Sequence, residues 1–183
     1  MRSVELLLDE ETDAMVRAEW AVLLDAGLPS QGRHPGASNA PHITLAAGED
    51  LGLDEVDWTD LPLPVRWSGF VVFGAPPKGL VLARLVTTGR ALITLHERVH
   101  ERSTGTDALS SPGRWTPHVT LASRLTPAQL ADALAVLAAP PVLAAPAVLN
   151  GPVSDTDSHA PRAVRARLWD GPTKTITILG PSE

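Results

Sequence analysis

A five-residue sequence occurs twice in this chain, and it constrains the possible folds more than any other feature. Residues 41–45 are PHITL and residues 117–121 are PHVTL, so four positions are identical and the fifth exchanges one β-branched residue for another. The two copies lie too far apart in the chain for a short-period solenoid. The repeat therefore predicts two similar lobes, each carrying one copy.

Both copies have the composition of short β-strands, in which side chains alternate between two faces. In the first copy, His42 and Thr44 point to one face, whereas Ile43 and Leu45 point to the other. The proline that precedes each histidine suits the first residue of a strand, where no backbone donor is needed. Each copy therefore presents an apolar face to a core and a His/Thr face to a cleft.

If the two strands lie together, two imidazoles and two hydroxyls converge: His42, Thr44, His118 and Thr120. Two imidazoles suit a phosphodiester reaction, because one accepts a proton from the attacking oxygen and the other donates one to the leaving oxygen. The ordinary histidine pKa of about 6.5 makes both protonation states available near neutral pH. Threonine hydroxyls can donate to the non-bridging phosphate oxygens, and no metal is needed.

Residues 40–45 and 115–121 together resemble the 2H phosphoesterase superfamily, and most closely its bacterial 2′–5′ RNA ligase / cyclic nucleotide phosphodiesterase branch. The resemblance covers nearly the whole chain. It implies that His42, Thr44, His118 and Thr120 are the catalytic positions, in two pseudo-symmetric lobes that share a groove. The expected activity is hydrolysis of a 2′,3′-cyclic phosphate on a nucleotide or RNA 3′ end, and relatives can also run the reverse 2′–5′ ligation.

Four further residues are candidates for substrate binding. Relatives often carry a basic residue two positions after the second motif, where this chain has Ser123, followed by Arg124. Arg114 and Trp115 directly precede the second motif and are expected at the mouth of the cleft. Trp67 lies on a predicted strand, where it would stack on a base or pack in the core.

A competing motif is the sequence HERVH at residues 96–100, which matches H-E-x-x-H. On a helix, His96 and His100 lie one turn apart and can bind zinc, with Glu97 as general base. The metzincin extension is missing, because position 103 is serine and position 106, three residues later, is threonine and not a third histidine. A zinc metalloprotease is therefore an alternative function, and a non-catalytic nucleotide-binding module is another.

Composition limits the partners and the compartment. The chain has 183 residues, no cysteine and a net charge of −6. The negative charge argues against binding to long nucleic acid, which needs a basic surface, but leaves room for a nucleotide or an RNA end in a local cleft. We expect a cytoplasmic monomer without a cofactor, and the absence of cysteine suits this compartment. We expect no signal peptide, because acidic residues from Asp9 follow the short apolar run near the N-terminus. We expect no membrane-spanning segment, because prolines and Asp132 interrupt the apolar run at 128–149.

The remaining pattern predicts an α+β fold, with antiparallel sheets forming a central cleft and helices on the outside. We expect a single domain over 1–183 made of two intertwined, pseudo-symmetric lobes. Predicted strands besides the two motifs cover residues 4–8, 65–73, 80–86, 142–149, 164–169 and 174–179. Predicted helices run from 9 or 12 to about 26, from 88 to about 102 and from 126 onward, whereas 48–60 and 103–114 are predicted to be mainly loop.

Overall fold

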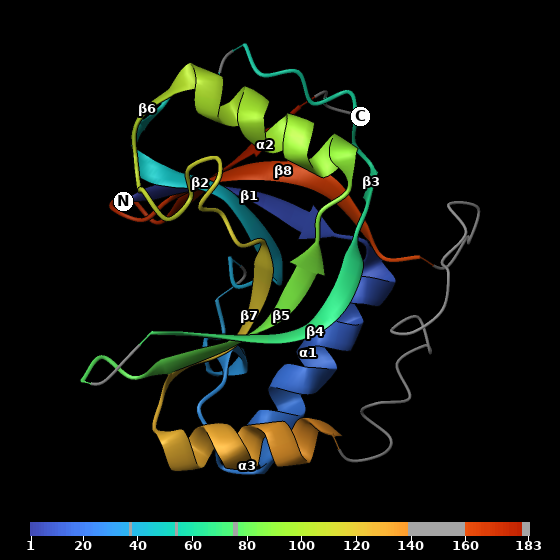
Figure 1. Cartoon of the computed structure of the whole chain (residues 1–183), viewed down its shortest axis with the longest axis vertical. Helices are drawn as coiled ribbons and strands as arrows, with labels where there is room; N and C mark the ends of the chain where they lie inside the picture. Colours follow the sequence, from blue (N-terminus) through green and yellow to red (C-terminus); the bar gives the residue numbers. More distant parts are fainter. Residues whose placement is uncertain (37, 54, 75–76, 139–159, 181–183) are drawn as a thin grey trace.

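A computed structural model describes residues 1–36, 38–53, 55–74, 77–138 and 160–180. The predicted strand over 142–149 lies outside the described residues. Three α-helices, one 3₁₀ helix and nine strands are present in the described part of the chain (Figure 1). In chain order they are β1 (Arg2–Leu8), α1 (Glu10–Asp25), η1 (Gln31–Arg33), β2 (His42–Leu51), β3 (Leu63–Pro64), β4 (Arg66–Gly74), β5 (Leu80–Thr87), α2 (Arg90–Arg102), β6 (Ser103–Thr106), β7 (His118–Leu125), α3 (Pro127–Ala138), β8 (Arg162–Asp170) and β9 (Thr175–Leu179).

The strands form two sheets. The large sheet has the order β3-β8-β1-β2-β6, with β9 also paired to β8, and the small sheet has the order β4-β5-β7. The pairs within both sheets are antiparallel. The motif strands β2 and β7 belong to different sheets but contact each other. The two sheets therefore meet along the strands that carry the repeated sequence.

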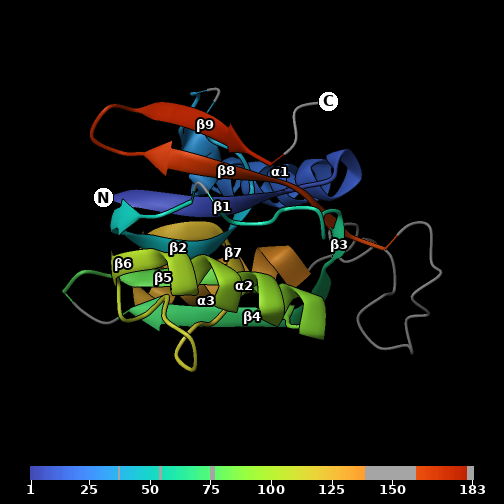
Figure 2. The ribbon, with the colours of Figure 1, turned by 90° about the horizontal axis from the view of Figure 1, so that it is seen from above.

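Each half of the fold contains the same strand–helix–strand unit: β1-α1-β2 and β5-α2-β7. In each unit the first strand pairs with the motif strand, and the helix packs on the sheet of the other unit. Helix α1 contacts β7 and α3, whereas α2 contacts β2 and β6. Figures 1 and 2 show α2 over the large sheet, with α1 and α3 beside the small one. The predicted α+β fold with two pseudo-symmetric lobes and outer helices is confirmed.

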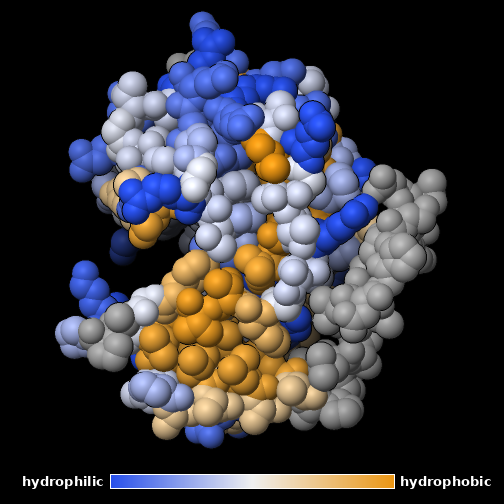
Figure 3. Space-filling model, in the orientation of Figure 1, coloured by the Kyte–Doolittle hydropathy of each residue, from blue (hydrophilic) through white to orange (hydrophobic). Residues whose placement is uncertain are grey.

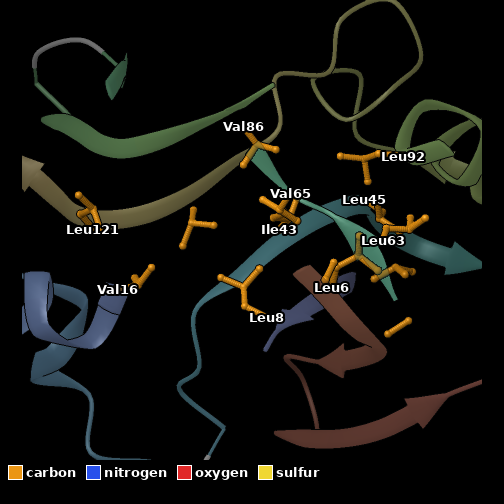
Figure 4. Close-up of a cluster of buried hydrophobic side chains, with 14 of the residues drawn as sticks. Leu6, Leu8, Val16, Ile43, Leu45, Leu63, Val65, Val86, Leu92 and Leu121 are labelled. Carbon is orange, nitrogen blue, oxygen red and sulfur yellow. The ribbon is translucent and has the colours of Figure 1, made fainter. Parts of the chain in front are cut away.

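The hydrophobic core lies on the faces of the sheets that the helices cover. Ile43 and Leu45 of β2 and the equivalent Val119 and Leu121 of β7 are completely buried. Figure 4 shows Leu121 close to Val16 of α1 at one end of a cluster that continues through both sheets. Burial of each such side chain stabilises the fold by about 1.5–3 kcal/mol. This burial fixes the strand register, and the register turns His42 and His118 away from the core.

Side chains satisfy backbone donors at the starts of α1 and α3. Asp9 caps α1 by accepting a hydrogen bond from the backbone of Thr12 at 2.9 Å. Thr126 and Gln129 bond reciprocally to each other's backbone N–H at the start of α3, where Pro127 is the first helical residue. These bonds satisfy donors that have no partner within the helix. Of the described helices, none combines the length and the apolar character that crossing a bilayer requires.

The prediction of loops over 48–60 and 103–114 was wrong at one edge of the large sheet. Strand β2 continues to Leu51 and pairs there with β6. Gly48 permits the close approach, because a Cβ at this position would lie 2.8 Å from the carbonyl oxygen of Gly105. The polar composition that suggested loops instead supplies cross-strand bonds, such as that from Thr104 to Asp50 at 2.8 Å.

Strand β4 does not alternate regularly between its two faces. Regular alternation along the predicted strand would place Trp67 and Val71 on one face, but the register shifts between Trp67 and Phe70. Gly69 lies in this bulge with a φ of 98°, a conformation that favours glycine. Trp67 and Phe70 consequently share one face, and Val71 lies on the other.

Candidate active site

The two motif histidines have matching environments at the first positions of β2 and β7. The Nδ1 atom of His42 lies 2.8 Å from the carbonyl oxygen of Ala40, and that of His118 lies 2.7 Å from the carbonyl oxygen of Thr116. A carbonyl oxygen can only accept, so each Nδ1 must carry a proton. In the neutral imidazole Nε2 is therefore the basic nitrogen on both sides.

The backbone carbonyl of each motif threonine accepts a hydrogen bond from a tryptophan indole. Trp115 donates from its indole Nε1 to the carbonyl oxygen of Thr44 at 2.8 Å, and Trp20 donates to that of Thr120 at 3.0 Å. Each indole therefore fixes the backbone of one motif strand. Trp20 is one of the buried residues of α1, and nothing in its local sequence identifies the partner of its N–H group.

A cavity of about 610 Å³ lies between the lobes. Figure 3 shows the molecule hollowed between its upper and lower halves. The wall of the cavity is mainly apolar, with several polar groups among the hydrophobic ones. The lining residues are Gln31, Thr44, Ala47, Phe73, Val81, Asp107, Leu109, Ser110, Arg114, Trp115, Thr116, His118, Thr120 and Ser123. A volume of this size is typical of small-molecule sites.

The structure brings most of the sequence-predicted site residues to this cavity. Thr44, Thr120, His118, Arg114 and Trp115 all line it. The three others do not line it. They are His42, whose side chain is 35% exposed, Trp67, which packs against the core, and Arg124, which is exposed with a φ of 61°.

The electrostatic environment of His118 favours its neutral form. Burial lowers the pKa of His118 below its ordinary value, and the charge of His42 lowers it further, whereas the hydrogen bond to Thr116 acts in the opposite direction. The ring of Phe73 packs on the imidazole with 4.6 Å between centroids. At neutral pH, His118 therefore has an unprotonated Nε2 in the wall of the cavity.

His42 has a different neighbour, which sequence reasoning missed. The Nε2 atom of His42 lies 3.6 Å from Oε1 of Glu5 on the adjacent strand β1. Glu5 accepts a hydrogen bond from Arg167 Nε at 2.8 Å and one from Ser3 Oγ at 2.6 Å. The Glu5 and Arg167 side chains are both about 5% exposed. The alternation of β1 could have placed Glu5 opposite the apolar face, but only the strand pairing shows which residues it meets.

Comparison with known proteins identifies the family. A family model described as the 2′-5′ RNA ligase superfamily matches residues 58–148, a segment that contains the second motif. The chain belongs to this superfamily. The resemblance inferred from the two motifs is thus confirmed.

The chain was also compared with solved structures and with curated protein sequences. The structure of Kluyveromyces marxianus Usb1 with uridine monophosphate is similar over 98% of this chain and 97% of that chain, with 13% sequence identity and a TM-score of 0.49. No curated protein sequence matches the chain.

The H-E-x-x-H motif has a structural role in this 2′-5′ RNA ligase superfamily member. His96 Nε2 lies 2.8 Å from the carbonyl oxygen of Ser110, and His100 Nε2 lies 3.1 Å from that of Leu45. His96 is buried and stacks on Trp115, with 4.0 Å between ring centroids. Both Nε2 atoms are thus engaged by carbonyl oxygens, and the described residues contain no group of three potential metal ligands. No observation favours the zinc metalloprotease alternative.

We predict that His96 makes the fold sensitive to acid. Burial lowers the pKa of His96 to about 4. In the unfolded chain this histidine binds a proton near pH 6.5, so acidification favours unfolding from about 6.5 down to about 4. Over this pH range the free energy of unfolding falls by about 3 kcal/mol. Urea unfolding at several pH values should show a steeper fall in this free energy for wild type than for His96→Gln, because glutamine keeps an N–H donor but does not titrate. Parallel curves would contradict the prediction.

Proposed function

We propose that this chain is a phosphodiesterase that hydrolyses 2′,3′-cyclic phosphates on nucleotides or RNA 3′ ends without a metal ion. The observation that carries the proposal is the matched pair of imidazoles at the starts of two contacting strands. The Nδ1 atoms of His42 and His118 are fixed by backbone carbonyls. Each Nε2 is therefore left to accept or donate one proton, as a two-proton mechanism requires.

In the proposed reaction, water attacks the phosphorus and gives a proton to Nε2 of His118. The bond between phosphorus and one ribose oxygen breaks, and that oxygen takes a proton from Nε2 of His42. The lowered pKa of His118 supports its role as the base. The hydroxyls of Thr44 and Thr120, which line the cavity, donate to the non-bridging oxygens. Each proton transfer contributes about 10²–10⁴ to the rate.

The same groups can catalyse ligation if a ribose 5′-hydroxyl replaces water as the nucleophile. This hydroxyl attacks the cyclic phosphate and gives its proton to His118, the bond from phosphorus to the 3′ oxygen breaks, and that oxygen takes a proton from His42, which leaves a 2′–5′ linkage. The cavity of about 610 Å³ suits a nucleotide or an RNA terminus. The net charge of −6 gives little attraction for a longer RNA.

Hydrolysis of the four 2′,3′-cyclic mononucleotides and of a short RNA with a cyclic phosphate tests the proposal. We expect turnover in the presence of EDTA. Activity should fall on acidification only below pH 6.5, because the pKa of His118 is lowered and its Nε2 stays unprotonated down to that pH. Absence of turnover on all of these substrates, or activity that EDTA abolishes and zinc restores, would refute the proposal.

A further inference from the structure

The two halves of the site differ at one register position. On the large sheet, Thr44 pairs with Glu5 of β1. On the small sheet, the equivalent Thr120 pairs with Ala83 of β5. A carboxylate therefore lies beside the first motif, where the second has only a methyl group. The hydrogen bonds of the histidine Nδ1 atoms and those of the two indoles are, by contrast, the same at both motifs.

Glu5 is held in a fixed position by three strands. Its carboxylate accepts hydrogen bonds from Ser3 on its own strand and from Arg167 on β8, and it faces His42 on β2 at 3.6 Å. In register, Glu5 pairs directly with Arg167 on one side and with Thr44 on the other. A buried carboxylate fixed in this way stabilises a positive charge on a neighbouring group more strongly than a mobile one in water.

We propose, on the basis of the hydrolytic function proposed above, that Glu5 is a positioning residue that makes His42 the proton donor of the site. During the reaction the proton moves from His42 Nε2 to the departing ribose oxygen, and Glu5 stabilises the imidazolium that must be present before this transfer. Among the described residues, His118 has no carboxylate partner of this kind. Glu5 thus makes the two histidines of the pseudo-symmetric site unequal, with His42 as the proton donor.

Three other groups that carry or can gain a positive charge lie on this side of the site. Arg167 neutralises part of the Glu5 charge, so the repulsion of a bound phosphate is small. Arg165 lies on the same face, because it pairs with Leu7, which in turn pairs with His42. His118 faces His42 from β7, and the charge of His42 lowers the pKa of His118. Glu5 is the acidic group that these contacts bring to His42.

A leaving-group experiment tests this role. The variant Glu5→Gln keeps the shape of the side chain and removes its charge. A 2′,3′-cyclic nucleotide requires protonation of its leaving oxygen, whereas the p-nitrophenyl ester of thymidine 3′-phosphate releases a nitrophenolate that needs none. We expect Glu5→Gln to lower kcat on the cyclic phosphate only about 10-fold, because one charge interaction is lost. The kcat on the aryl ester should stay within about twofold of wild type, because its leaving group needs no proton. His42→Ala should show the same selectivity more strongly, whereas His118→Ala should lose both activities.

Two further variants separate positioning from structural damage. Glu5→Gln/Arg167→Met removes both charges, so no buried arginine is left unpaired, and it should show the same selective loss. Glu19→Gln breaks a second buried Glu–Arg pair, that of Glu19 with Arg84, and should not change the ratio of the two activities. Equal losses on both substrates, or no loss on the cyclic phosphate, in Glu5→Gln and the double variant would overturn the inference. A wild type without turnover of any cyclic phosphate would instead refute the proposed function.

Discussion

Replacing His118 with alanine is expected to lower kcat/KM for cyclic-phosphate hydrolysis by about 10²–10⁴-fold, because the variant loses the group proposed to take the proton from water. His118 lines the cavity and has its pKa lowered by burial, as a base that works at neutral pH requires. Initial rates at several substrate concentrations, measured at pH 7 with EDTA, check this prediction.

His34 provides a matched control for this variant. It is an exposed histidine in the segment before the first motif, and it does not line the cavity. His34→Ala should keep wild-type kcat/KM, and the thermal unfolding of both variants should stay close to that of wild type. If His118→Ala kept activity within tenfold of wild type, His118 would not be the base.

The largest expected effect on stability comes from the buried pair of Glu19 and Arg84. Both side chains are at most 5% exposed, Arg84 Nε donates to Glu19 Oε1 at 2.9 Å, and the guanidinium lies over the ring of Phe70 at 4.3 Å. Glu19→Gln leaves the arginine charge buried without its counter-charge, so we expect the free energy of unfolding to fall by about 3–5 kcal/mol. Urea denaturation followed by circular dichroism measures this loss.

The double variant Glu19→Leu/Arg84→Met tests the cause. If the penalty comes from an unpaired charge, removing both charges should recover most of the stability, because apolar residues of similar volume often replace a buried ion pair at little cost. A double variant as unstable as the single one would show that the packing of these side chains, rather than their charges, holds α1 against β5.

The repeated pentapeptide was enough to predict the two faces of each motif strand. A strand has only two faces, so His42 and Thr44 had to lie opposite Ile43 and Leu45 once these were buried. The same reasoning applied to the second copy, and the two motif strands do contact each other. The fold class followed because the elements around each copy also repeat.

The rest of the site depends on contacts between distant parts of the chain. Trp20 meets Thr120 across 100 positions, and Glu5 meets Arg167 across 162. Neither pair has a local signal, because an amphipathic pattern shows which face is buried but not against what it is buried. The bulge at Gly69 and the strand β6 were missed for the same reason, since register and edge pairing are set by neighbouring strands.

The exchange of helices between the two halves has a consequence for how the cleft can move. Helix α1 follows a strand of the large sheet but packs on the small one, and α2 does the reverse. Rotating one lobe away from the other would therefore pull each sheet off the helix that covers its core, at the expense of the burial that stabilises the fold. The two motif strands are thus held in a fixed relative position. A substrate that binds between the lobes would meet a preformed site, and little of its binding energy would be needed to close the lobes.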